Sequence, residues 1–174
     1  MALSIAALNV NSRGSKSALV LRDNERFAHV FEQPVECPFV PGSYNREESS
    51  LRQNIVFRPT PELEEFFSKL DVWAVEYVTE HSERLLGKQL TREQVEFSYV
   101  SNIKRAEGKP PLAKFKINMP GPNKPARCWS EDSQPVELIQ DWAGRTLKIK
   151  FSRVTPVGHG QCSKSRVRLC VPPH

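Results

Sequence analysis

The stretch from Thr60 to Gly87 constrains the fold more than any other part of the sequence. Apolar residues recur there at three- and four-residue steps, which is the period of an α-helix with one buried face. Thr60 is a good N-cap because its hydroxyl can accept a hydrogen bond from a first-turn amide, and Pro61 suits the first helical position. Gly87 can end a helix in a left-handed conformation. We therefore predict one long helix between Thr60 and Gly87.

The apolar face of this helix combines aromatic and aliphatic side chains: Leu63, Phe66, Phe67, Leu70, Ala74, Tyr77 and Val78. Such a stripe is typical of a helix that faces the core, and we prefer that interpretation to a groove for a partner helix. A second, short helix is predicted to begin after Thr91, because Thr91 and Gln94 have the spacing of a capping box. Val95 and Tyr99 would give this second helix one apolar side.

Short alternating segments surround the helices, and alternation with a period of two is typical of strands with one buried face. The predicted strands are 4–10, 18–21, 27–31, 54–58, 112–119, 126–130, 136–139, 145–154 and 166–171. Residues 33–53 contain three prolines and a polar run, and residues 101–111 end in Pro110–Pro111. Both segments are predicted to be loops.

Several short strands, a helical insertion and further short strands favour a mainly β fold. We predict an OB-like antiparallel barrel with one long and one short helix packed on it. At 174 residues the chain is expected to form a single domain, residues 1–174, with the helical insertion at about residues 60–100. No apolar run approaches the length of a membrane span, so no membrane partner is expected. The N-terminal apolar patch follows no basic segment and is short, which favours an intracellular protein.

The charge of the chain is strongly asymmetric. Residues 1–100 hold 11 Lys and Arg against 15 Asp and Glu, a net charge of −4, whereas residues 101–174 hold 14 against 5, a net charge of +9. A basic excess concentrated in one part of a chain suggests a polyanionic partner, most often a nucleic acid. The alternative is a solvated basic face with no such partner.

Basic residues alternate along three predicted strands, as Lys114/Lys116, Lys148/Lys150 and Arg166/Arg168. If these strands are neighbours, their basic side chains form a stripe that can follow the phosphates of a nucleic-acid strand. Tyr99, Trp129 and Trp142 are interleaved with them, and a basic groove with stacking aromatics is what sequence-independent single-strand binding requires.

The candidate binding residues are therefore Lys114, Lys116, Arg127, Trp129, Arg145, Lys148, Lys150 and Tyr99. The four lysines would contact phosphates, Arg127 and Arg145 would assist them, and Trp129 and Tyr99 would stack on bases. The alternative is that the lysines form an ordinary solvated sheet face and that the tryptophans belong to the core.

Metal binding and catalysis have little support in the sequence, and a zinc-supported module is the least favoured alternative. His159, Cys162, Cys170 and His174 are residue types that zinc accepts, but the spacing between the two cysteines is too short for a zinc finger. We expect no metal and no other cofactor. The motifs of serine hydrolases, zinc proteases, P-loop enzymes and dinucleotide-binding enzymes are absent, so we do not expect an enzyme. The four cysteines form no CxxC pair and are expected to be free thiols.

Five segments follow one another between Asn54 and Phe151: LEEFFSKLDVWAVEYV, GKQLTREQVEFSY, PPLAKFKIN, Arg127–Trp129 and WAGRTLKIKF. In this order they resemble the single-stranded-DNA-binding proteins of certain phages and their counterparts in large DNA viruses of eukaryotes. The resemblance implies an OB-like barrel with a helical insertion, a role in DNA replication or repair, and often a homodimer. It does not extend to the closing strands in residues 152–174.

The end of the chain also departs from that pattern. Proteins of the resembled class usually end in an acidic tail that contacts polymerase or helicase partners, whereas the last 33 residues here contain no Asp or Glu. The resemblance thus implies replication proteins as partners, but the acidic tail that usually recruits them is absent here.

The predicted function is sequence-tolerant binding of single-stranded DNA, with RNA as the alternative ligand, in DNA replication or repair. The expected location is the nucleus or a viral replication site. The alternative function is that of a structural or interaction protein, such as a virion or scaffold component, whose basic face binds an acidic partner. In that case the helix stripe around Phe66, Phe67 and Tyr77 would be an assembly surface.

Overall fold

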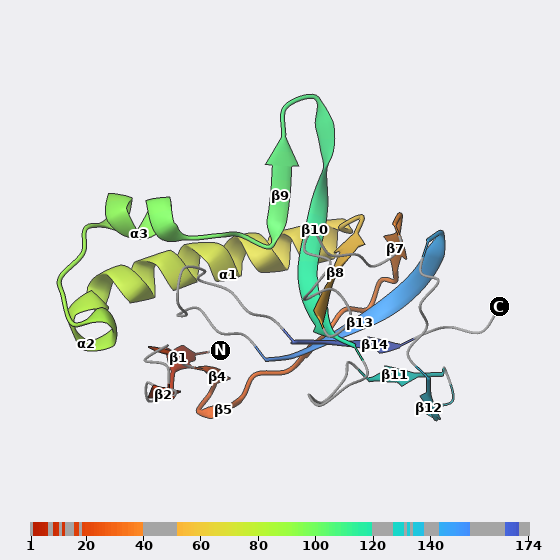
Figure 1. Cartoon of the computed structure of the whole chain (residues 1–174), viewed down its shortest axis with the longest axis horizontal. Helices are drawn as coiled ribbons and strands as arrows, with labels where there is room; N and C mark the ends of the chain where they lie inside the picture. Colours follow the sequence, from red (N-terminus) through yellow and green to blue (C-terminus); the bar gives the residue numbers. More distant parts are fainter. Residues whose placement is uncertain are drawn as a thin grey trace.

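The fold is taken from a computed structural model of the chain, shown in Figure 1. The structure describes residues 2–6, 9–10, 12, 16–17, 19–39, 52–119, 127–130, 132, 134–137, 143–153 and 166–170. Within these ranges it does not describe the side chains of residues 9, 10, 16, 17, 26, 52, 118, 150–153 and 166–170. Among the described helices, none has the length and apolar character needed to cross a membrane.

The long helix predicted to follow Thr60 is α1, Pro61–Glu80. Thr60 caps it as expected, because its hydroxyl accepts a hydrogen bond from the Leu63 amide at 3.3 Å. The helix ends at Glu80 rather than near Gly87, so the prediction of a single helix is wrong. A separate short helix, α2 (Ser82–Leu86), follows and ends at Gly87, which has the expected left-handed conformation with φ +76°.

The break between α1 and α2 lies at His81, which has φ −109° and ψ 19°. Ser82 is fully buried there, and its hydroxyl donates to the Thr79 carbonyl oxygen at 3.1 Å. The same hydroxyl accepts a hydrogen bond from the Leu90 amide at 2.9 Å. The Ser82 hydroxyl thus satisfies backbone groups that a turn would leave unpaired in the interior, which stabilises the break.

The apolar face of α1 packs on the core, as the sequence predicts. The helix buries Leu63, Phe67, Leu70, Ala74, Val75 and Val78. The Phe67 ring lies 6.2 Å from the Phe31 ring and 5.3 Å from the Phe115 ring, measured between centroids. Phe66 is half-buried against the apolar cluster that contains Phe67, and Tyr77 is half-buried against a second cluster that contains Val78. Because each large apolar side chain contributes roughly 1.5–3 kcal/mol on full burial, this face holds the helix on the sheet.

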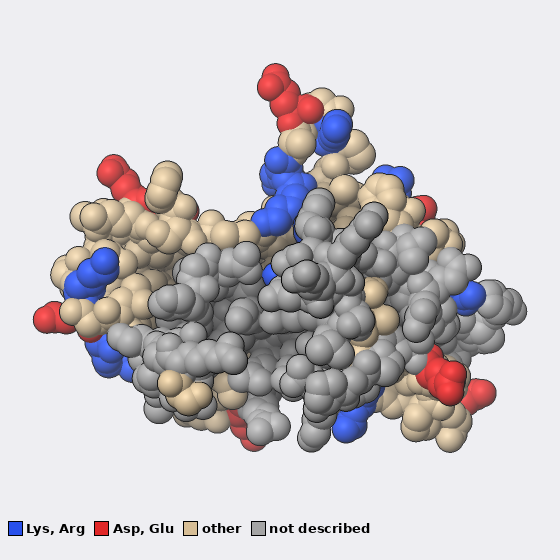
Figure 2. Space-filling model, viewed as in Figure 1, with Lys and Arg blue, Asp and Glu red and all other residues tan. Residues whose placement is uncertain are grey.

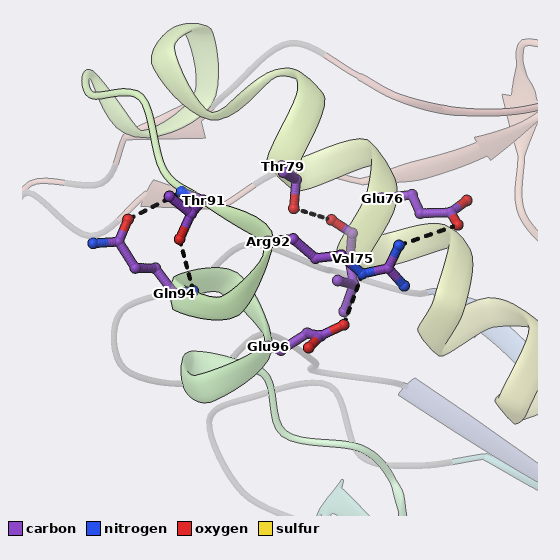
Figure 3. A network of polar contacts seen from close by, with 7 residues as sticks. All are labelled: Val75, Glu76, Thr79, Thr91, Arg92, Gln94 and Glu96. Carbon is purple, nitrogen blue, oxygen red and sulfur yellow. Dashed lines mark hydrogen bonds and ion pairs between the residues drawn. The ribbon is translucent and has the colours of Figure 1, made fainter.

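The second predicted helix is α3, Arg92–Ser98, and its capping box is present (Figure 3). The Thr91 hydroxyl accepts from the Gln94 amide at 3.3 Å, and Gln94 Oε1 accepts from the Thr91 amide at 3.0 Å. Val95 is buried in an apolar cluster with Val75 and Val78 of α1 and Leu85 of α2. The sequence signal at Thr91 therefore locates this helix correctly.

Five strands form the wall of an OB-like barrel: β7 (Val35–Cys37), β8 (Arg52–Phe57), β10 (Lys109–Asn118), β13 (Arg145–Arg153) and β14 (Arg166–Cys170). β8 pairs with β10, and β13 pairs with both β7 and β14, always antiparallel. A bridge between Glu36 and Arg58 joins β7 to the end of β8, and β10 lies beside β14. The strands thus follow one another around the wall in the order β10, β8, β7, β13, β14.

Alternate residues of these strands fill the barrel. The buried positions are Val35 and Cys37 on β7, Ile55 and Phe57 on β8, Ala113, Phe115 and Ile117 on β10, and Leu147 and Ile149 on β13. The residues between them face outward, as the pleat requires. The mainly β, OB-like fold with helices packed on it is therefore confirmed, and the outer wall of the barrel is free to present polar side chains.

Residues 101–111, predicted to be a loop, mostly form a hairpin, so that prediction is wrong. β9 (Ile103–Ala106) pairs antiparallel with the first part of β10, and Gly108 at the turn has φ +68°. Pro110 and Pro111 lie in β10 where the ladder is irregular, between Lys109 and Leu112. A proline is tolerated in a strand at such an irregularity, because no ladder hydrogen bond is required of it.

Residues 33–53, also predicted to be a loop, contain β7 and the start of β8. β7 is only three residues long and lies between Pro34 and Pro38, so it is too short to show a clear alternation. Its place in the wall is decided by pairing with β13, where Leu147 is the register partner of Val35. β8 begins at Arg52, two residues before the predicted strand.

The N-terminal segment forms short strands: β1 (Leu3–Ile5), β2 (Asn9–Val10), β3 (Lys16–Ser17), β4 (Val20–Arg22), β5 (Glu25–Arg26) and β6 (His29–Val30). The strand predicted at 4–10 is therefore split in two. Asp23 and Asn24 have φ of +50° and +64°, which is the two-residue turn that favours a β4–β5 hairpin. β6 pairs with β13 and so ties this segment to the barrel.

Two further strands, β11 (Cys128–Trp129) and β12 (Pro135–Val136), extend the sheet beyond β14. β11 pairs parallel with β14 and antiparallel with β12. The strand predicted at 136–139 begins one residue earlier, and residues 138–139 lie outside the described part of the chain.

Candidate nucleic-acid interface

Lys114 and Lys116 lie on the outer face of β10. The residues between and beside them, Ala113, Phe115 and Ile117, are buried in the barrel, so alternation turns the two lysines outward. Lys114 is half-buried and Lys116 is exposed. Their register partners on β8 are Val56 and Asn54, which carry no charge. The outer face of the β8–β10 pair is therefore basic where Lys114 and Lys116 lie.

Lys148 lies on the outer face of β13, where it is exposed between buried Leu147 and Ile149. Its register partner on β14 is Cys170. Lys150 takes the next alternate position on β13, and its register partner is Arg168. The side chains of Lys150, Arg166 and Arg168 lie outside what the structure describes.

The three strands with alternating basic residues are neighbours in the barrel wall. β14 pairs with β13 on one edge and with β11 on the other, and residues of β10 lie close to β14 without forming a ladder with it among the described strands. The backbone thus brings the three strands close together, and the basic stripe across them stays a prediction. We call the outward-facing Lys114, Lys116 and Lys148, together with the backbone position of Lys150, the lysine ladder.

Trp129 joins the lysine ladder through the parallel pairing of β11 with β14. Trp129 is the register partner of Cys170, and Cys170 is in turn the register partner of Lys148. Trp129 and Lys148 therefore occupy the same row across the sheet, two strand spacings apart, or roughly 10 Å. Cys128 is buried, whereas Trp129 is half-buried and Arg127 is exposed, so the aromatic ring lies at the outer side of the sheet.

Arg145 stands apart from this row. It is the first residue of β13 and the register partner of Cys37 on β7. Thr146 and Lys148 are exposed on the outer face of β13. Arg145 lies on the other side of the strand, the side that carries the buried Leu147. The structure thus places half-buried Arg145 at the end of the barrel, on the opposite side of the strand from Lys148.

Tyr99 is also separate from the lysine ladder, because it packs among the helices. Its hydroxyl donates to Asp71 Oδ1 on α1 at 2.6 Å, and its ring lies against the apolar cluster that contains Val95. Ser101 donates to the other oxygen of the same carboxylate at 2.5 Å. Tyr99 therefore anchors the segment between α3 and β9. Trp142, the third aromatic candidate, lies outside the described residues.

Lys104, on β9, is a basic residue that the sequence prediction missed. It is the register partner of Leu112, and so lies diagonally across the hairpin from Lys114. Burial and the positive charge of Lys114 lower the pKa of Lys104, and the charge of Asp71 acts in the opposite direction. The signal that could have found it is the Glu107–Gly108 turn between two short basic segments, which is consistent with a hairpin.

Most of the candidate zinc ligands lie outside the described residues, and the adjacent acids at the start of α1 and the Cys37 thiol have structural partners. His159, Cys162 and His174 fall outside the described residues, and the residues that are described contain no cluster able to hold a metal ion. Glu64 pairs with Arg105, and Glu65 pairs with Lys69. Cys37 is buried, its thiol donates to the Val56 carbonyl oxygen at 3.2 Å, and burial raises its pKa to about 11. A thiol with such a pKa is unreactive near neutral pH.

No family model matches the chain, and no curated protein matches it. The chain is similar in structure to gp2.5, a single-stranded DNA binding protein encoded by bacteriophage T7, known from its crystal structure. The two chains are 13% identical, the match covers 83% of this chain and 87% of the phage chain, and the TM-score is 0.44. The phage protein belongs to the class that residues 54–151 resemble.

Proposed function

We propose that the chain binds single-stranded DNA without strong sequence preference, as an accessory protein of DNA replication or repair. The phosphates would lie on the lysine ladder, formed by Lys114, Lys116, Lys148 and Lys150, and at least one base would stack on Trp129. The observation that supports this proposal most directly is the row Lys148–Cys170–Trp129, which brings a cation and an aromatic ring to one outer sheet face.

The chemistry of this face suits a single strand better than a duplex. Ammonium groups can attract the phosphates of either form, and these contacts do not depend on sequence. An aromatic ring at a sheet surface can stack on a base only where the base is unpaired and turned toward the protein. Each stack contributes about 1–3 kcal/mol, so the ring adds a preference for single strands to the general electrostatic attraction.

Arg127 and Arg145 have different parts in this proposal. Arg127 is exposed next to β11 and extends the basic face beyond Trp129. Arg145 lies at the end of the barrel and would contact the DNA strand only at the edge of the proposed binding surface. Tyr99 is assigned to the packing of the helices, because its hydroxyl is bonded to Asp71. The proposed location is intracellular, in the nucleus or at a viral replication site, where single-stranded DNA is exposed during replication.

The charge reversal Lys148→Glu tests the proposed site. We expect it to weaken binding of an unstructured single-stranded oligonucleotide by about tenfold or more, as loss of a charge-assisted hydrogen bond of about 1.5–3 kcal/mol requires. The slope of log affinity against log salt should fall by about 0.7 for the lost phosphate contact. Fluorescence anisotropy at several salt concentrations measures both quantities.

The matched control is Lys88→Glu, which makes the same change of charge in the exposed segment after α2. We expect this control to bind nearly as well as the unmodified chain, with an unchanged salt slope. If Lys148→Glu and Lys88→Glu weaken binding equally, the attraction depends on net charge and the assignment to the lysine ladder is wrong.

A further inference from the structure

The β9–β10 hairpin and α3 rise on the same side of α1 (Figure 1). In the space-filling view the outline of the molecule dips between them, and Lys and Arg side chains gather at the base of the hairpin (Figure 2). Residues 104–110 of the hairpin are all exposed. The hairpin is therefore a projecting wall that faces a hollow, and it is available to contact a partner.

The base of this wall is fixed by its own contacts. Arg105 forms an ion pair with Glu64 on α1, and the Ser101 hydroxyl bonds to Asp71 on the same helix. Asn102 is buried and its side-chain amide donates to the Lys114 carbonyl oxygen at 2.8 Å. These bonds orient the hairpin relative to α1 without using Lys104 or Lys109. Within the described part of the chain, neither of these two lysines forms an ion pair.

The hairpin is continuous with the lysine ladder. β10 starts at Lys109 beside the turn, and passes Lys114 and Lys116 before it ends at Asn118. At about 3.3 Å per residue the ten residues of this strand span roughly 30 Å. Lys104 on β9 lies diagonally across from Lys114. Partial desolvation lowers the pKa of Lys104, and the like charge of Lys114 lowers it further. A phosphate placed between these two ammonium groups would relieve their repulsion.

α3, which lies across the hollow from the hairpin (Figure 1), carries an exposed aromatic residue. Phe97 on α3 is 94% exposed, and Val95, on the other face of the helix, is buried against α1. α3 is held in place by its capping box and by Arg92, which pairs with Glu96 at 2.8 Å and lies 3.8 Å from Glu76 of α1 (Figure 3). Because Arg92 offsets one of the two negative charges, the pair of carboxylates opposes the approach of a phosphate less strongly. A rigid helix thus carries a ring that touches little of its own chain.

We propose that this hollow is a second contact region for the same nucleic-acid strand that lies on the lysine ladder. The strand would continue along β10 from Lys116 to the hairpin, where Lys104 and Lys109 contact phosphates, and an unpaired base would stack on Phe97. This inference rests on the proposed function and adds to it the path of the strand and a longer binding site. It assigns binding roles to three residues outside the lysine ladder.

A length series of oligothymidylates tests the inference. A short oligonucleotide of about six nucleotides fits on the barrel alone, and one of about 25 nucleotides reaches both regions, since one OB fold covers about 4–16 nucleotides. We expect Lys104→Glu/Lys109→Glu and Phe97→Ala each to weaken binding of the long oligonucleotide by about fivefold or more. Both variants should bind the short oligonucleotide as the unmodified chain does.

Two controls separate stacking and charge from nonspecific effects. Phe97→Tyr keeps an aromatic ring on α3 and should retain the affinity for the long oligonucleotide, whereas Phe97→Leu should lose it as Phe97→Ala does. Lys88→Glu controls for the change of charge. Circular dichroism checks that the exposed substitutions leave the fold intact.

The possible failures are distinguishable. If the unmodified chain binds no oligonucleotide of either length, the proposed function is wrong, and so is the second contact region that depends on it. If the unmodified chain binds but the variants match it at both lengths, only the second contact region is wrong. Equal weakening at both lengths would also contradict it, because a region reached only by the long strand cannot affect the short one.

Discussion

His29 shows how a single side chain links packing to pH. Its ring stacks on Phe66 at 4.3 Å with an interplanar angle of 18°, and it meets the Phe31 ring edge-on at 4.8 Å. The Arg22 guanidinium lies 3.4 Å from His29 Nδ1. Burial, together with the positive charge of Arg22, lowers the pKa of His29, while Glu62 acts in the opposite direction. The folded state therefore disfavours the imidazolium.

This lowered pKa predicts a loss of stability in mild acid. Above the unfolded pKa of about 6.5 the ring is neutral in both states and contributes no pH dependence. As the pH falls below about 6.5 the unfolded chain takes up a proton that the folded chain resists, so the free energy of unfolding decreases. The non-titrating His29→Phe variant, which keeps an aromatic ring there, should lose less stability between pH 7.5 and 5.5 than the unmodified chain. Urea unfolding at the two pH values measures this, and equal losses in both proteins would refute it.

At the scale of elements, α3 depends on its N-terminal cap. Thr91→Ala removes the hydroxyl that accepts from the Gln94 amide, and we expect it to lower the free energy of unfolding by about 1 kcal/mol. Ser98→Ala, which removes a hydroxyl from the exposed last turn of the same helix, should change it by less than about 0.5 kcal/mol. Urea unfolding followed by circular dichroism compares the two variants. A similar small effect of both would show that the capping box adds little.

The elements that the sequence predicts well are those determined locally. The caps at Thr60 and Thr91 and the apolar period of α1 are set within a few residues of each other, and the structure confirms all three. The break at His81 was missed because it depends on the Ser82 hydroxyl reaching Leu90, eight residues away. β7 and β9 were missed because each is only three or four residues long and is stabilised by pairing with a strand elsewhere in the chain.

The candidate site was predictable in its residue types but not in its geometry. Alternation alone turns Lys114, Lys116 and Lys148 outward, and it also sets Arg145 at a position of the opposite parity. The row that joins Trp129 to Lys148 depends on the parallel pairing of β11 with β14, which leaves no mark in the sequence. The bond of the Tyr99 hydroxyl to Asp71, 28 residues earlier, cannot be read from local pattern.

At the scale of the whole molecule, charge and architecture coincide. The basic excess of residues 101–174 is carried by the strands β9, β10, β13 and β14, whereas the acidic residues of the first hundred positions include the helix side chains that pair with Arg92 and Arg105. The chain thus places cations on its barrel wall and hairpin and balances part of the charge of its helices. Such a distribution attracts a polyanion to one region of the surface.

The most direct test of this account is the affinity of the unmodified chain for a labelled single strand and for the matching duplex, measured by fluorescence anisotropy at rising salt. We predict tighter binding to the single strand, a steep loss of affinity between about 50 and 200 mM salt, and quenching of tryptophan fluorescence on binding. Equal affinity for the two forms would contradict base stacking on Trp129. No binding to either form at low salt would contradict the central claim that this barrel face holds nucleic acid.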